Sequence, residues 1–84
     1  MNNERSLLDS ATRYRIEVRN KVDAEWLQSF NVSMEITVDD TEQMEDSTVF
    51  KVHTDQSGIV GLVRRLHGLG LTILQLELIT RKEN

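Results

Sequence analysis

The chain has 84 residues, of which 38% are hydrophobic and 29% are charged, and this composition is typical of one small globular domain. Its 14 Asp and Glu exceed its 10 Lys and Arg, and the net charge of −4 opposes the phosphate neutralisation on which nucleic-acid binding depends. With no cysteine for disulfides or zinc, and no stretch near the roughly 20 apolar residues that span a bilayer, we expect a cytoplasmic protein without nucleic-acid or membrane partners.

The chain is predicted to open with a tail and a strand. Residues 1–12 show no sustained periodicity and are rich in Asn, Ser and charge, so we expect a flexible tail. A single domain is predicted over residues 13–80, followed by a polar end at residues 81–84. Along residues 14–19 apolar and charged side chains alternate, which is the period of a half-buried strand.

A short helix and a second strand are predicted next. Asp23 can cap a helix that ends near Ser29. The side chains that would dock this helix on the sheet are Trp26, Leu27 and Phe30. Residues 32–38 then alternate, with Val, Met, Ile and Val on one side and Ser, Glu and Thr on the other. This alternation predicts the second strand.

An acidic segment separates the second and third predicted strands. Residues 39–47 carry five carboxylates and one apolar side chain, Met44, which predicts a mobile hairpin loop that limits association at the neighbouring strand. No calcium site is expected, because the D-x-[DN]-x-[DN]-G spacing and its glycine are missing. Residues 48–54 are rich in β-branched side chains and predict the third strand, with Phe50 and Val52 facing inward.

The longest predicted helix begins after Asp55, a good N-cap residue, and Gly68 is expected to end it. Its apolar residues recur at the spacing of one helix face, and they are Ile59, Leu62, Val63 and Leu66. After Gly70, residues 71–80 alternate again and predict a final strand. Its two faces carry Leu74, Leu76 and Leu78 toward the core, and Ile73, Gln75, Glu77 and Ile79 away from it.

This element order predicts an α+β fold, a ferredoxin-like β-α-β-β-α-β sandwich. Right-handed crossovers give a four-stranded antiparallel sheet of order 4-1-3-2 with two helices on one face. The other face is expected to carry mixed charges. RNA-binding domains of this topology stack bases on aromatic rings of the central strands, and the outward positions of those strands supply none here.

Two histidines are the candidates for chemistry. Neither His53 nor His67 stands in a cluster of carboxylates at ligand spacing, so no metal site is expected. His53 beside Lys51 and the cross-strand carboxylates Glu17 and Glu35 is conceivable as a general base. The alternative is a solvated strand histidine among ion pairs, and no catalytic residue or cofactor is predicted.

Gly58 and Gly61 are unusual, because each glycine inside a helix costs about 1 kcal/mol relative to alanine. Close approach of the helix to the sheet or to a partner subunit would explain them, and a small-molecule site at the helix start is the alternative. Arg64, Arg65 and His67 further along interact favourably with the negative end of the helix dipole. A functional basic patch is the alternative there.

Residues 54–71 resemble a group of short bacterial proteins of unknown function that read D-Q-x-x-L-x-G-L-L-x-x-[IL]-x-x-L-G-L. Those proteins also pair a Tyr-x-Ile-x-Val strand with a short Trp-containing helix, as residues 14–18 and 22–26 do here. The resemblance covers nearly the whole domain and implies no activity. The chain departs from the group in having Gly58 and Ile59 where Ala-Leu-type residues are common.

Residues 55–60, followed by residues 70–73, also resemble the ACT-domain signature D-x-x-G-[IL]-[LV] with a later G-[IL]-x-[IL]. ACT domains share this topology and bind amino acids between paired subunits, although their signature lies in the first βαβ unit and this one lies in the second. The resemblance implies that backbone amides at the helix start would face a ligand carboxylate. The residues of this expected ligand site are Asp55, Gln56, Ser57 and Gly58.

The leading functional hypothesis is a non-catalytic homodimeric interaction module, because a core this small gains from added burial. The residues expected at the interface are Val49, Lys51, His53, Gly61, Ile73 and Ile79. The alternative is an ACT-like regulatory domain that binds a small metabolite such as an amino acid and is stabilised by it. A small enzyme of the dimeric ferredoxin-like barrel type, with His53 as its base, is the third hypothesis.

Overall fold

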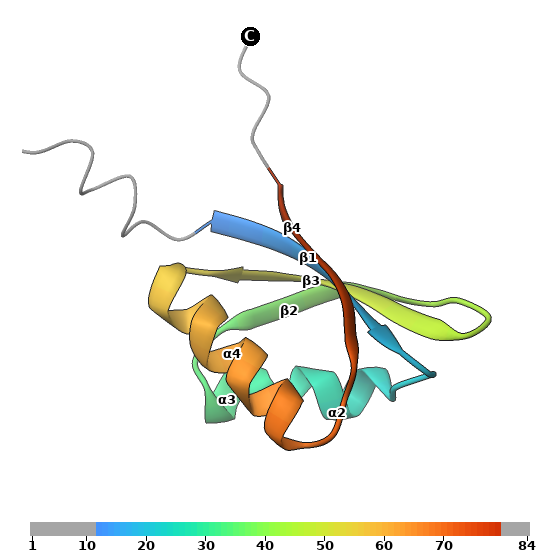
Figure 1. The fold of residues 1–84 in the computed structure, drawn as a ribbon. Coiled ribbons are helices and arrows are strands. Elements are labelled where there is room, and N and C mark those ends of the chain that lie inside the picture. The colour runs from blue at the N-terminus through green and yellow to red at the C-terminus, as the bar shows by residue number, and fades with distance from the viewer. Residues whose placement is uncertain (1–11, 80–84) are drawn as a thin grey trace, which may run out of the picture.

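The computed structural model describes residues 12–79. It has a four-stranded antiparallel sheet with helices against one face (Figure 1). The strand order is β2-β3-β1-β4, which is the predicted 4-1-3-2 arrangement read from the other edge. None of the helices between Thr12 and Ile79 has the length and the apolar run needed to cross a membrane. In chain order the elements are β1 (Thr12–Arg19), α2 (Ala24–Gln28), α3 (Phe30–Ser33), β2 (Thr37–Gln43), β3 (Ser47–Thr54), α4 (Gln56–Gly68) and β4 (Ile73–Ile79).

The core lies between the sheet and the helices. Ile16 on β1 and Phe50 on β3 lie opposite each other in register, and both are fully buried. Leu27 from α2 and Leu62 and Leu66 from α4 belong to the same core cluster and also have no exposed surface. The alternation predicted for the first and third strands is therefore confirmed, since alternate residues of one strand face opposite sides of the sheet.

The predicted short helix is confirmed as α2, and the chain then stays helical through α3. The Asp23 side chain accepts a hydrogen bond from the Glu25 N–H at 3.2 Å, as an N-cap does. Leu27 and Phe30, three residues apart, are both buried. Trp26 packs edge-to-face on Phe30 with ring centroids 5.1 Å apart, although it remains 37% exposed.

The prediction of a strand over residues 32–38 is wrong for residues 32–36. Val32, which the alternation directed inward, is 84% exposed on α3. Burial of Phe30 one turn after Leu27 favours continued helix, and this packing overrides the local alternation. The Asn31 side chain then accepts the Val38 N–H at 2.8 Å at the start of β2, which begins at residue 37.

The acidic segment also differs from the prediction, because its first part lies in β2 and only residues 44–46 turn the chain. Asp39 stands opposite Lys51, and the register shifts after it, where Asp40 has a φ of 52°. Arg13 lies 3.4 Å from Asp39, and Lys51 lies 3.7 Å from Asp40. These cations balance part of the charge of the segment, whose acidic composition led us to expect a loop.

Thr48 is a buried polar residue that ties β3 to the chain after β1. Its hydroxyl accepts the Val22 N–H at 2.7 Å and donates to the Asn20 carbonyl at 2.9 Å. The side chain has no exposed surface, so both bonds are protected from water. They hold the connection between β1 and α2 against the sheet.

α4 ends at Gly68, as predicted. Gly68 is still helical, and Gly70 is the residue with the left-handed φ of 87°. The Gly70 N–H donates to the His67 carbonyl at 3.0 Å, and the Leu71 N–H donates to the Leu66 carbonyl at 3.0 Å. This pair of bonds is the Schellman motif, which satisfies the free carbonyls at a helix end.

A β-bulge changes the face of one residue at the start of β4. Gln75 lies opposite Glu17, and Ile73 lies opposite Val18, so β4 has one residue more than β1 between these pairs. Ile73 therefore packs against the core cluster, and its predicted place on the open face is wrong. The extra residue shifts the alternation by one position, which a regular strand pattern does not anticipate.

Candidate functional site

The start of α4, where the sequence predicts a ligand site, is built around Asp55. Its carboxylate accepts the Gly58 N–H at 2.8 Å and the Ser57 hydroxyl at 3.2 Å, and its carbonyl accepts the Ile59 N–H at 3.0 Å. Asp55 therefore caps α4 as predicted. The Gly58 amide, which the ACT resemblance assigns to a ligand carboxylate, already binds a carboxylate of the chain itself.

Gly58 is explained by a close approach between α4 and the sheet. A Cβ at this position would overlap the Thr54 hydroxyl and would lie 3.1 Å from the Thr54 Cβ. Thr54 ends β3 and is buried, so it has little room to yield. Gly61 differs, because a Cβ there would lie 3.5 Å from the Met34 methyl group, which is an ordinary contact. The structure gives no steric reason for Gly61.

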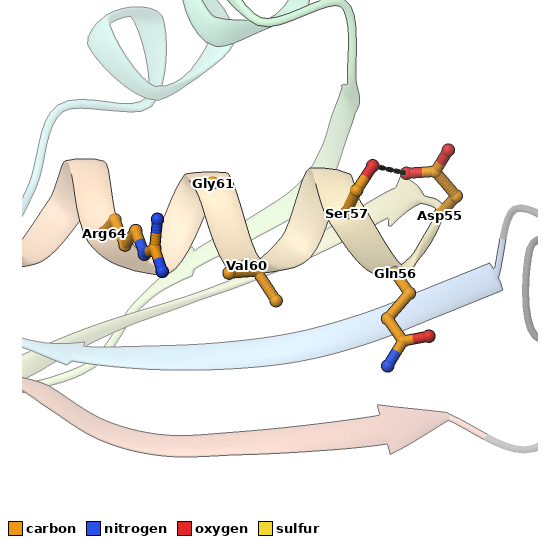
Figure 2. Close-up of a pocket in the computed structure, with 6 residues that line it drawn as sticks. All are labelled: Asp55, Gln56, Ser57, Val60, Gly61 and Arg64. Carbon is orange, nitrogen blue, oxygen red and sulfur yellow. Dashed lines mark hydrogen bonds between the residues drawn. The ribbon is translucent and has the colours of Figure 1, made fainter.

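A hollow of about 590 Å³ lies beside this turn, lined by Asp55, Gln56, Ser57, Val60, Gly61 and Arg64 (Figure 2). Three of the four predicted ligand residues thus line the hollow, and Gly58 does not. All of the lining comes from α4 and its cap, and the Gln56 and Ser57 side chains leave opposite sides of the first turn (Figure 2). Ligand pockets usually enclose most of the ligand and present converging polar groups. This hollow has no opposing wall.

The interface residues predicted on β3 differ in accessibility. Val49 is 5% exposed and offers no surface to a partner. Lys51 is half-buried and forms an ion pair with Asp40 at 3.7 Å. His53 is exposed. The three side chains therefore do not form a continuous docking surface.

His53 lacks the carboxylate neighbours that the sequence predicted for a general base. Its register partners are Arg13 on β1 and Thr37 on β2. Glu17 lies four pairs further along β1, and Glu35 precedes β2. Among residues 12–79 no group of three or more His, Asp or Glu is placed to hold a metal ion. The expected flanking of His53 by Glu17 and Glu35 is wrong.

The rest of the open sheet face is occupied by paired charges. The Arg15 guanidinium lies 3.4 Å from the Gln75 side-chain oxygen and 4.0 Å from the Glu77 carboxylate. The Glu17 carboxylate accepts the Ser47 hydroxyl at 2.7 Å. Exposed pairs of this kind contribute at most about 1 kcal/mol each, so they balance charge more than they stabilise the fold.

Three leucines on β4, which the sequence analysis placed in the core, form an exposed row instead. Leu74, Leu76 and Leu78 are 44%, 45% and 54% exposed, and we call them the leucine stripe. Leu76 lies opposite the fully buried Ile16, so the stripe lies on the sheet face that the helices cover. It is exposed because β4 is an edge strand, and α4 meets only its start, at Ile73 (Figure 1).

The sequence does contain a signal for this exposure. The predicted strand order places the final strand at an edge, and a single helix has only one apolar stripe with which to cover the sheet. The core-facing residues of α4 are Ile59, Leu62 and Leu66, and they meet the central strands. Alternation identifies which face a residue occupies, but it does not say whether that face is covered.

A second hollow, of about 660 Å³, adjoins the leucine stripe. It is lined by Val63, Arg64 and His67 from α4 and by residues 70–73. Its walls thus come from the last turns of α4 and the start of β4. Ile73, which lines the hollow with Arg64 and His67, directly precedes Leu74, so the hollow lies next to the start of the stripe. The hollow and the stripe together are the candidate functional site.

Comparison with known proteins matches the chain to a family whose description names no activity. A family model described as a domain of unknown function, DUF8691, matches residues 13–77. The match begins in β1 and ends in β4, so it includes the whole α4–β4 surface. No curated protein and no solved structure matches the chain.

Proposed function

Because the chain belongs to the DUF8691 family, whose description names no activity, we propose a function from its own surface: a non-catalytic homodimeric interaction module. The strand order supports the finer assignment of the domain to the ferredoxin-like sandwich. The partner in this proposal is a second copy of the same chain.

The leucine stripe is the observation that carries the proposal. Leu74, Leu76 and Leu78 stand in a row, each close to half exposed, on a strand whose outer edge has no neighbour within the described residues. Rows of large apolar side chains on a protein surface mark interaction sites. A domain of this size also buries only about 60% of its unfolded surface, so it gains stability from a partner.

The ACT-like alternative remains a prediction. In its favour, three of the four predicted ligand residues, Asp55, Gln56 and Ser57, line the hollow at the start of α4. Against it, the Asp55 carboxylate would repel a ligand carboxylate at this position, and it already accepts the Gly58 N–H. The experiment that separates the two proposals is thermal unfolding across a panel of amino acids, where a binder raises the midpoint by mass action.

Native mass spectrometry and sedimentation equilibrium of the full chain test the homodimer. We expect a dimer at micromolar concentration, without a retained small molecule. A chain that is still a monomer at high micromolar concentration contradicts the proposal. A dimer that carries extra small-molecule mass would support the metabolite-binding alternative, and the mass would identify candidate ligands.

A further inference from the structure

The two edge strands of the sheet, β2 and β4, differ in how readily they could pair with a strand of another molecule. β2 carries Asp39, Asp40 and Glu42, and a register shift interrupts its ladder. Charges and bulges of this kind are how native proteins block edge-to-edge association. β4 has one charged residue, Glu77, and no proline or lysine in its seven residues, and its bulge is confined to the start of the strand, so that residues 75–79 pair regularly with β1. Its edge is open to pairing.

We propose that the second copy binds along β4, so that the two β4 strands pair antiparallel about a two-fold axis at Leu76. The two four-stranded sheets then become one continuous sheet of eight strands. This inference rests on the proposed homodimer and specifies its surface and register. Antiparallel pairing of two identical strands satisfies the two-fold symmetry that most homodimers have.

The register follows from the sequence of the strand. An axis at Leu76, the middle residue of Ile73–Ile79, gives the longest overlap of the two strands, and Leu76 lies in the regular part of β4, outside the bulge between Ile73 and Gln75. Leu74 then lies opposite the partner's Leu78, and Leu76 lies opposite the partner's Leu76. Residues directly opposite each other point to the same face, so the two leucine stripes merge into one cluster of six leucines. The helices of both copies lie on that same face.

The charges on β4 favour the same register. An axis at Leu76 places Gln75 opposite the partner's Glu77, where the amide can donate to the carboxylate. A shift of the axis by one residue to Glu77 would place two carboxylates directly opposite each other, which is destabilising. A shift to Gln75 would place Ile73 opposite the partner's Glu77.

The hollow at the end of α4 fits this arrangement. Leu74 follows Ile73, which lines the hollow together with Val63 and Leu71. The partner's Leu78, opposite Leu74, would therefore lie beside the hollow. A side chain that is 54% exposed in the single chain would gain an apolar contact there. The interface thus combines strand pairing with burial of apolar surface.

A lysine on the stripe tests which surface the dimer uses. We expect Leu76→Lys to be monomeric at concentrations where the unsubstituted chain is dimeric, because it buries two cations side by side. Val32→Lys is the control, since Val32 is 84% exposed on α3, away from β4. Circular dichroism establishes that both variants are folded. A Leu76→Lys chain that is folded and still dimeric overturns the β4 interface and leaves the homodimer intact.

Single cysteines test the register, because the chain has no cysteine of its own. Opposed residues in an antiparallel pair have Cβ atoms about 4.5–5.5 Å apart, near the disulfide range of about 3.5–4.5 Å. We expect oxidation to cross-link Leu76→Cys but not Leu74→Cys, whose two copies would lie about 13 Å apart. A mixture of Leu74→Cys and Leu78→Cys should cross-link.

The outcomes separate this inference from the function on which it rests. A dimer in which Leu76→Cys fails to cross-link, or in which Leu74→Cys alone does, overturns the register. A monomeric chain overturns both the register and the homodimer. The full chain could also be a monomer that dimerises only when residues 1–11 are deleted. In that case the leucine stripe of the full chain binds residues 1–11 instead of a second copy, and this result also overturns the inference.

Discussion

Gly58 and Gly61 lie in the same helix, yet a methyl group added at each would meet different surroundings. At Gly58 it would collide with Thr54, a buried β-branched residue at the end of β3. At Gly61 it would meet only the flexible end of Met34 at contact distance. Packing requires glycine at residue 58, whereas at residue 61 glycine only lowers the stability of the helix.

We expect Gly58→Ala to lower the free energy of unfolding by about 1–2 kcal/mol, because overpacking outweighs the gain in helix propensity. Gly61→Ala is the matched control and should raise it by up to about 1 kcal/mol. Urea denaturation measures both. Equal effects of the two substitutions would contradict the close approach of α4 to Thr54.

At the scale of elements, the ends of helices and strands differ most from the sequence prediction. The periodicity of α4 correctly gave its core-facing stripe, whereas its end depends on which glycine takes a left-handed φ. That glycine is Gly70, and Gly68 remains in the helix. A Schellman motif needs such a residue just after the C-cap, here Leu69.

We expect Gly70→Ala to destabilise the fold by about 1–2 kcal/mol, because an L side chain is strained at the left-handed φ. Gly68→Ala is the control, since a Cβ there meets nothing within 4 Å. It should leave the stability unchanged or raise it by up to about 1 kcal/mol. If thermal denaturation finds the reverse order, Gly70 is not the left-handed residue that terminates α4.

The first crossover shows how packing outweighs a local pattern. The alternation over residues 32–38 is as regular as that of β1, yet residues 30–33 are helical. The helix continues because Phe30 and Leu27 reach the core together only at helical spacing. The acidic residues that followed were expected in a loop, and they form an edge strand because β3 supplies its hydrogen bonds.

At the scale of the whole molecule, the distribution of apolar surface suggests a fold completed by a second copy. The helices cover the central strands and leave the leucine stripe of β4 in solvent. The other edge strand, β2, carries three carboxylates, Asp39, Asp40 and Glu42. One edge is therefore suited to association and the other resists it.

Stability should depend on protein concentration if the chain folds as a dimer. A tenfold dilution of the protein lowers the contribution of dimerisation to the free energy of unfolding by about 1.4 kcal/mol per dimer. For two chains of this size we expect Tm to fall by roughly 4 °C. Differential scanning calorimetry over two decades of concentration measures this, with Leu76→Lys as the variant whose Tm should not change. A constant Tm for the unsubstituted chain contradicts the dimer.

The sequence by itself determined the fold class, the strand order, the inward faces of β1 and β3, and both N-caps, Asp23 and Asp55. These features follow from short-range periodicity and local hydrogen bonding, which a single chain segment expresses alone. Only the tertiary structure decided the helical turn after Ser29, the bulge beside Leu74 and the exposure of the leucine stripe. Each of these depends on which neighbours cover a residue, and that is a property of the assembled layers rather than of any segment.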